Sequence, residues 1–184
     1  MSLEYAILGF LEDEPVTGYD LKKVFDRSIV HFWAADQSQI YRTLSLLHKQ
    51  GWVRKEIVPQ EQRPTRKVYH ITEEGRAALR AWLATPLPAD TPRIPWLIQL
   101  FFAGQIEDAE VLRVLESKAA SLRAKLARYT RVLAEAEAHI GEEASPRDKF
   151  FWLSTLDYGV VTAEAQLAWL EQVIERVRQG AWAA

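Results

Sequence analysis

Two long stretches of the chain carry a heptad repeat, and only a short break separates them. In residues 108–140 apolar side chains recur at alternating spacings of three and four, and the same spacing returns between Pro146 and Gly180. This spacing gives a helix one continuous apolar seam, which is typical of helices that pack on one another. Because the break at Gly141 is short, we expect the two helices to form an antiparallel hairpin.

The hairpin carries more apolar side chains than it can bury by itself. Val114, Tyr158, Val161 and Trp169 are among those that lie off the two seams. We therefore expect a homodimer built on these helices, since closed twofold dimers are the commonest oligomers. The alternative is that residues 96–103, an almost wholly apolar stretch expected to form a buried helix, cover the surplus. The positions assigned to dimerisation are Leu115, Leu122, Leu126, Tyr129, Leu156, Val160, Leu167, Leu170 and Ile174.

The first half of the chain is organised around residues 36–72. Asp36 is a typical helix cap, one face of the helix that follows is apolar, and Gly51 is suited to end it in a left-handed conformation. Two short strand-like runs follow around a basic turn. A polar helix followed by a basic hairpin is the pattern of a winged helix, in which the helix enters a major groove and the hairpin straddles the backbone.

Helical patterns on both sides of this stretch complete a compact unit. Residues 2–12 show one apolar face, Thr17 begins a second helix with a capping pattern, and residues 72–84 begin with a hydroxyl cap and two acids. Four prolines then fall within ten residues, which marks a linker. The expected fold is mainly α, with a winged helix-turn-helix and a two-stranded wing in residues 1–85, a linker in 86–95 and the long-helix hairpin in 96–184.

Charge and composition narrow the class of function. The net charge is −2, but residues 37–70 hold seven Lys or Arg against two acids, a local balance of +5. Local positive potential favours nucleic-acid binding, although a basic strip can also be an ordinary solvated surface. With no cysteine, no long apolar run and no signal peptide, we expect a cytoplasmic protein without a membrane span. The four histidines are scattered and no catalytic motif appears, so neither an enzyme nor a metal or cofactor is expected.

Five motifs in the first half together resemble one family. They are Ala6–Leu11, the Gly-Tyr-Asp-Leu run 18–21, the Ser-Gln-Ile-Tyr-Arg-Thr-Leu run 38–44, the Gln-Gly-Trp-Val run 50–53, and the Tyr-His-Ile-Thr-Glu-Glu-Gly run 69–75. In this order and spacing they resemble the PadR family of bacterial transcriptional regulators. The helical second half is similar to the longer subfamily, which has a helical dimerisation domain.

The resemblance implies a homodimeric winged-helix regulator, most often a repressor that a small molecule or another signal releases from a pseudo-palindromic operator on double-stranded DNA. Best-known members respond to phenolic acids. In the family, the recognition-helix tyrosine and basic wing residues touch DNA, and these positions correspond to Tyr41, Arg63, Arg66 and Lys67. Many members have a proline where this chain has Arg42, and the common glycine-rich wing tip is replaced by Arg-Pro-Thr at 63–65.

The residue types also suggest individual roles. Gln37 and Gln39 are suited to hydrogen bonds with base edges. The hydroxyl and basic side chains of the set given below are suited to contacts with phosphates. Two tyrosines have a structural alternative to DNA contact. For Tyr41 this is packing on the first helix, and for Tyr19 it is burial beside Leu3. The full set assigned to DNA binding is Tyr19, Gln37, Ser38, Gln39, Tyr41, Arg42, Thr43, Lys49, Arg63, Thr65, Arg66 and Lys67.

Seven tryptophans in 184 residues raise the question of a ligand. Aromatic side chains that line a cavity suit a small aromatic effector, although packing between long helices is the ordinary role of such residues. The candidates for this site are Trp96, Phe101, Trp152, Tyr158 and Trp169. The rival interpretation of the whole chain is a helical module that recruits a protein partner, with an incidental basic surface.

Overall fold

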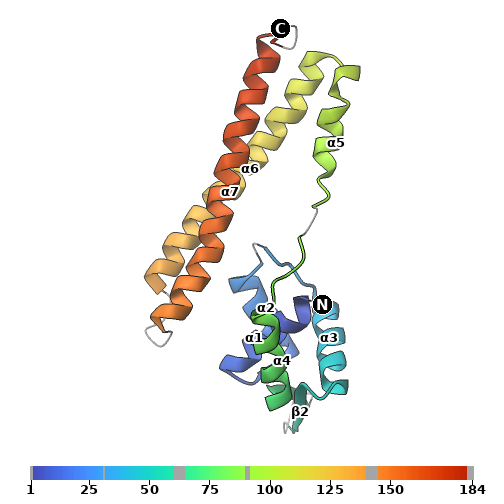
Figure 1. Ribbon diagram of the computed structural model, residues 1–184, viewed down its shortest axis with the longest axis vertical. Helices are drawn as coiled ribbons and strands as arrows, with labels where there is room; N and C mark the ends of the chain where they lie inside the picture. The colour runs from blue at the N-terminus through green and yellow to red at the C-terminus, as the bar shows by residue number, and fades with distance from the viewer. Residues whose placement is uncertain (1, 31, 60–64, 90–91, 140–144, 182–184) are drawn as a thin grey trace. The chain divides into compact units, whose positions relative to one another are not determined.

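The computed structural model describes residues 2–30, 32–59, 65–89, 92–139 and 145–181, without the side chains of 136–139. The chain divides into two compact units, Met1–Asp90 and Thr91–Ala184 (Figure 1). Each unit has its own buried apolar cluster. The two units are therefore described one at a time.

The first unit packs four helices and a small sheet around one core. Its elements are α1 (Ser2–Asp13), β1 (Val16–Thr17), α2 (Gly18–Ser28), α3 (Gln37–Lys49), β2 (Val53–Val58), β3 (Arg66–Ile71) and α4 (Glu73–Leu83). Ile40, Leu44 and Leu47 of α3 are completely buried, as the apolar spacing predicted. They meet Leu8 of α1 and Leu21 of α2 in the same cluster. The burial of this face leaves the polar face of α3 in solvent.

The ends of α3 and α4 confirm the predicted caps. The Asp36 carboxylate accepts a hydrogen bond from the Gln39 N–H at 2.7 Å, and the Gln39 side-chain oxygen accepts one from the Asp36 N–H at 2.9 Å. Gly51 follows α3 with a φ of 78°, a conformation that favours glycine. The Thr72 hydroxyl accepts from the Gly75 N–H at the start of α4. These contacts are local, which is why the sequence showed them.

The sheet has three strands rather than the expected two. Their order is β1-β3-β2 and both pairings are antiparallel. Strand β1 adds Val16 and Thr17 to the outer edge of β3, opposite Tyr69 and Val68. A two-residue strand is too short to show an alternating pattern, so it was not predictable from the sequence. Its effect is to join the start of α2 to the wing.

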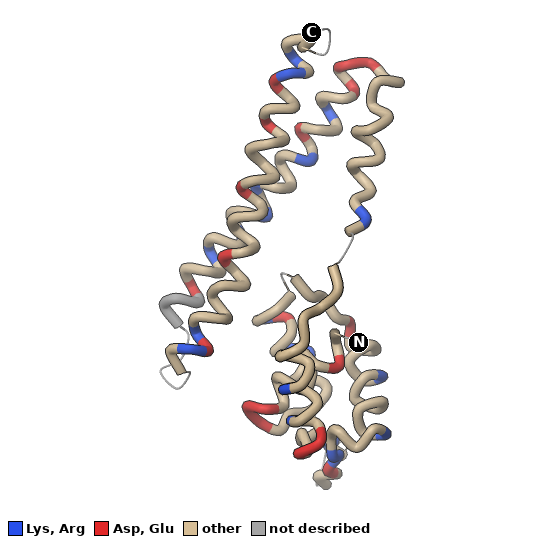
Figure 2. The backbone as a smooth tube through the Cα atoms, in the orientation of Figure 1, with Lys and Arg blue, Asp and Glu red and all other residues tan. Residues whose placement is uncertain are grey.

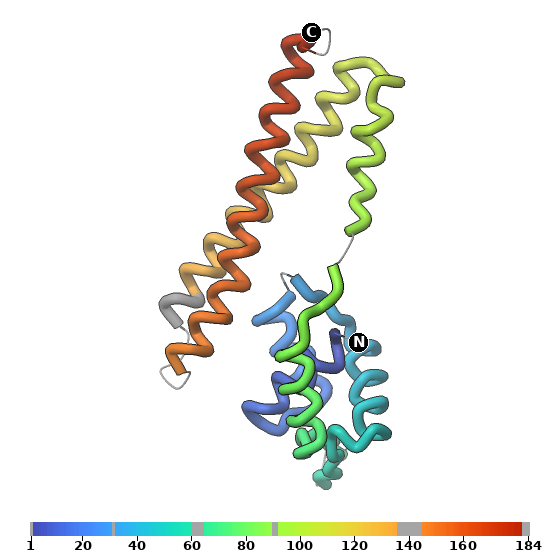
Figure 3. Tube along the Cα trace, in the orientation of Figure 1, coloured from blue at the N-terminus to red at the C-terminus, as the bar shows by residue number. Residues whose placement is uncertain are grey.

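The second unit is a long helical hairpin with a short helix beside it. Its elements are α5 (Pro95–Phe101), the 3-10 helix η1 (Ala103–Gln105), α6 (Asp108–His139) and α7 (Pro146–Arg178). Figure 3 shows α6 and α7 side by side, with the chain reversing direction between them. Within the parts of the chain that the structure describes, no helix combines the length and apolar content needed to span a membrane.

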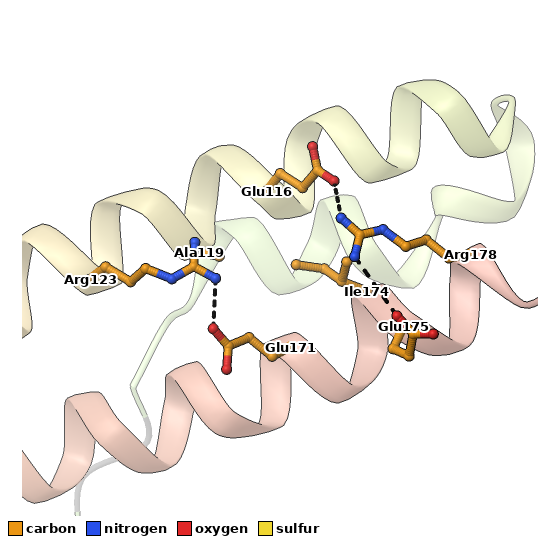
Figure 4. Close-up of a pocket in the computed structure, with 7 residues that line it drawn as sticks. All are labelled: Glu116, Ala119, Arg123, Glu171, Ile174, Glu175 and Arg178. Carbon is orange, nitrogen blue, oxygen red and sulfur yellow. Dashed lines mark hydrogen bonds and ion pairs between the residues drawn. The ribbon is translucent and has the colours of Figure 1, made fainter.

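Two ion pairs across the hairpin define its antiparallel register. Arg123 of α6 contacts Glu171 of α7 at 2.6 Å, and Glu116 contacts Arg178 at 2.7 Å (Figure 4). Moving back along α6 therefore corresponds to moving forward along α7. The ion pairs border a shallow groove whose floor includes Ala119 and Ile174. All four charged side chains are about half exposed, so the pairs contribute more to register than to stability.

The positions assigned to dimerisation already have partners inside the hairpin. Six of the nine are buried within the single chain and the other three are half-buried. The buried six are Leu115, Leu122, Tyr129, Leu156, Leu170 and Ile174. Heptad spacing identifies a packed seam but does not distinguish a partner helix in the same chain from one in another chain. The assignment to a dimer stays a prediction, and the exposed side chains of these helices are the surface free to meet a second copy.

The expectation that residues 96–103 form a buried helix is wrong for the single chain. Trp96 and Leu100 pack against the cluster between α6 and α7, but no residue of α5 is buried. Phe101 is 82 % exposed and Ile98 is 62 % exposed. Only one face of this short helix packs against a buried cluster, and the opposite face stays exposed.

Candidate nucleic-acid interface

The exposed face of α3 presents a row of polar and basic side chains. Because the buried residues of α3 recur every three or four positions, most of the intervening ones point to solvent. The exposed members of the predicted set are Gln37, Ser38, Gln39, Tyr41, Arg42 and Lys49, while Thr43 is half-buried. This row has the donors and cations that base edges and phosphates accept.

The first turn of α3 uses part of its polar surface for its own cap. The Ser38 hydroxyl donates to the Asp36 carboxylate at 2.7 Å, and this bond together with the Gln39 N–H lowers the pKa of Asp36 from its ordinary value of 3.8. The Gln39 side-chain oxygen is engaged by the Asp36 N–H. This hydrogen bond occupies one lone pair of the oxygen and fixes the side chain against the helix start, whereas a bidentate contact to adenine needs both amide atoms to face the base. Gln37 is therefore the better placed of the two glutamines.

Tyr41 packs against the start of α2 while keeping its ring partly exposed. A Cβ built on Gly18 would lie 2.5 Å from Tyr41 Cε1, so only glycine allows this approach. The expected packing partner was the first helix, and the structure shows the second. The contact places the Tyr41 ring against the start of α2 and leaves 38 % of the residue exposed.

Tyr19 is exposed, so the alternative of burial beside Leu3 is wrong. Its side chain is 55 % exposed, and Lys23 Nζ lies 4.3 Å from the centre of its ring. Tyr19 and Lys23 thus lie together on the exposed side of α2. This arrangement is compatible with a phosphate contact.

The two wing cations that the sequence singled out have different surroundings. Successive strand residues point to opposite faces, so Arg66 and Lys67 diverge. Arg66 Nη2 lies 2.9 Å from Asp20 Oδ2, whereas Lys67 is exposed and has no ion pair with any carboxylate that the structure describes. Thr65 is exposed, and Arg63 lies outside the described residues.

Figure 2 shows lysine and arginine on α3 and at the sheet of the first unit. No described carboxylate forms an ion pair with Lys49, Arg54 or Lys55. Arg54 and Lys55 belong to β2 and were counted in the basic balance, but no role was predicted for them individually. Their position in the wing was visible in the sequence. The Asp20 contact was not, because it joins residues 46 positions apart.

The second unit brings together only part of the predicted ligand set. The rings of Trp96 and Trp169 lie 5.8 Å apart, and Lys118 Nζ lies 5.4 Å from the Trp96 ring. Trp96 also lines a groove of about 710 Å³ between α5 and α6, but Phe101, Trp152, Tyr158 and Trp169 do not line it. The groove has an apolar wall and a few polar side chains, among them Arg113, Ser117 and Ser121.

The fold and this interface define a winged helix-turn-helix protein with a helical C-terminal unit. In the described part of the chain, no cluster of three or more His, Asp or Glu side chains is arranged to hold a metal. The chain matches the transcriptional regulator PadR-like family over residues 7–81 and the virulence activator alpha C-terminal family over residues 92–178. Over residues 7–81 the chain is therefore similar to PadR-like transcriptional regulators. Its relatives are named as regulators and not as enzymes.

Individual relatives agree with this assignment. A probable transcriptional regulator of Mycobacterium tuberculosis is 47 % identical over 92 residues, which are 50 % of this chain and 49 % of the relative, so the match spans about half of that protein. The negative transcriptional regulator PadR of Bacillus subtilis is 29 % identical over 141 residues, 73 % of this chain and 77 % of the relative.

Solved structures extend the likeness to nearly the whole chain. Bacillus subtilis PadR in complex with operator DNA superposes with a TM-score of 0.82 at 24 % identity, covering 96 % of this chain and 99 % of that one. The same protein in complex with p-coumaric acid gives 0.79 at 23 % identity, covering 97 % and 99 %. At these identities the likeness establishes the fold alone.

Proposed function

We propose that this protein is a homodimeric DNA-binding regulator whose first unit reads an operator half-site. The observation that carries the proposal is the exposed polar face of α3 beside the basic sheet of one winged-helix unit. Gln37 is assigned to a base edge, and Arg42, Lys49 and Lys67 to phosphates. Phosphate contacts fix the position on the duplex, and base contacts supply the sequence preference.

The exposed apolar side chains of the second unit support the dimer. Ile98 and Phe101 of α5, with Tyr158 and Val161 of α7, are all more than half exposed. Monomers rarely leave this much apolar surface in solvent, and a second copy of the chain would cover it. A twofold dimer presents two reading units, which matches a pseudo-palindromic operator.

The groove between α5 and α6 supports the regulatory part of the proposal. Trp96 supplies an aromatic face, and Lys118 beside it supplies a cation, a pairing that suits an aromatic acid. A relative of the same fold has been solved with p-coumaric acid. We assign this chain the role of a repressor that such an effector releases, through preferential binding to a dimer in which the half-site separation no longer fits the operator.

Fluorescence anisotropy with DNA from the protein's own promoter tests this function. Specific binding should exceed binding to a scrambled duplex of equal length by at least about a thousand-fold and weaken as salt rises. Adding p-coumaric acid should lower the affinity for the promoter duplex. The variant W96A should lose this response while keeping its affinity for DNA. Equal, weak binding to both duplexes would favour the rival function, a helical module that recruits a protein partner.

A further inference from the structure

We propose that Asp20 is a positioning residue for DNA binding, which acts through Arg66 to hold the wing against the start of α2. The inference rests on the proposed function, because it concerns how the same interface is held in shape. Arg66 is then a structural cation of the wing, and Lys67 beside it is the cation that meets phosphate.

The contacts around Asp20 form a closed network. Thr17 donates its hydroxyl hydrogen to Asp20 Oδ2 at 2.7 Å and accepts from the Asp20 N–H at 3.1 Å. Arg66 donates to the same carboxylate oxygen at 2.9 Å, and Lys23 Nζ stands 3.9 Å from the other oxygen. The hydrogen bond from Thr17, followed by Arg66, lowers the pKa of Asp20. The carboxylate therefore stays charged at neutral pH and keeps its partners.

The network joins β3 to β1 and α2, which follow each other directly in the sequence, and its Asp20–Arg66 contact spans 46 positions. Thr17 belongs to β1 and pairs with Val68 of β3, so the backbone and the side chains of this region connect the same two segments. Arg66 is the first residue of β3, next to the turn of the wing. Fixing that residue to α2 limits the directions in which the hairpin can swing relative to α3, which packs against α2. A preset wing loses less conformational freedom when DNA binds.

The strand geometry provides a matched control in Lys67. Register places Arg66 opposite Val58 and Lys67 opposite Ile57, on the two different faces of the hairpin. Lys67 is exposed and has no ion pair with a described carboxylate, so its charge is available to a phosphate. A cation already paired with Asp20 releases fewer counterions from DNA than a free one. The two neighbours should therefore differ in how they affect the salt dependence of binding.

The test measures affinity against salt concentration for promoter DNA and for a scrambled duplex, with wild type, D20N, R66Q, D20N/R66Q and K67Q. K67Q should weaken binding to both duplexes and lower the salt slope by about one unit. R66Q should leave the slope unchanged and weaken only promoter binding, by roughly two- to five-fold, the range of an exposed ion pair. D20N should weaken promoter binding by a similar factor and raise the slope by about one unit, because Arg66 becomes free to meet phosphate.

The double variant identifies the cation through which Asp20 acts. D20N/R66Q should return to the wild-type slope and bind the promoter no more weakly than either single variant. A slope that stays raised would show that Lys23 is the released cation and would overturn the proposal, as would an R66Q slope that falls like that of K67Q. Thermal unfolding of each variant shows whether it is folded, and R66Q alone tests the proposal if D20N is not. Wild-type protein that does not distinguish the two duplexes would instead overturn the proposed function.

Discussion

Gly159 of α7 lies directly against the ring of Tyr129 on α6. A Cβ at position 159 would stand 2.8 Å from Tyr129 Cε2 and 2.9 Å from Cδ2, closer than side chains ordinarily approach. Tyr129 is 3 % exposed, so its ring has little room to move aside. A glycine inside a long helix can serve either a close helix approach or an open space for a ligand. The geometry supports close approach, since the space is filled by Tyr129.

Replacing Gly159 should therefore destabilise the hairpin although alanine is the better helix former. We expect G159A to lower the free energy of unfolding by about 1–2 kcal/mol, since the overpacking cost exceeds the helix-propensity gain of about 1 kcal/mol. Gly9 of α1 is the control, because a Cβ there meets nothing within 4 Å. G9A should leave stability unchanged or raise it by up to about 1 kcal/mol. Urea unfolding measures both, and equal effects would contradict the packing argument.

The two glutamines at the start of α3 should separate stability from DNA recognition. Q39A removes the side-chain half of the capping box, and we expect it to lower the free energy of unfolding by about 0.5–1 kcal/mol. Q37A removes an exposed side chain and should change stability by less than about 0.5 kcal/mol. If Gln37 makes the base contact, Q37A should weaken promoter binding by about 1–3 kcal/mol. Urea unfolding and anisotropy on the same samples decide between the roles.

Tyr69 should make the protein sensitive to alkali. Burial, and then the nearby Tyr41, raise the pKa of Tyr69 above its ordinary value of 10.0. A raised folded-state pKa contributes stability that is fully present below the unfolded-state pKa and is lost as pH rises through the folded-state value. Above about pH 10, the unfolding free energy of wild type should therefore fall more steeply than that of Y69F. Parallel pH profiles for the two proteins would show that Tyr69 does not contribute.

The exposed face of α5 should control the oligomeric state. In the proposed dimer, I98S/F101S removes two large apolar contacts, so we expect the variant to shift from dimer to monomer in light scattering at micromolar concentration. L83S, which changes a side chain that is 67 % exposed in the first unit, is the control and should remain dimeric. A wild-type protein that is monomeric throughout would contradict the dimer itself.

Much of the interface was predictable because its signals are local. The apolar spacing of α3 identified its buried face, and hence which side chains face solvent. Asp36, Gly51 and Thr72 marked helix ends through contacts within a few residues. The contact between Asp20 and Arg66 left no such signal, because neither residue type nor spacing indicates which charges will meet across a fold.

The sequence by itself determined the helices, their caps, the winged-helix pattern and the presence of a hairpin, since each depends on periodicity or on neighbours along the chain. Only the tertiary structure decided that Arg66 is paired while Lys67 has no ion pair with a described carboxylate, and that the heptad seams close on each other within one chain. The exposure of one face of α5 was likewise decided only by the tertiary structure. The physical reason is that burial and charge pairing depend on what lies opposite a side chain in space, and the order of residues does not specify that partner.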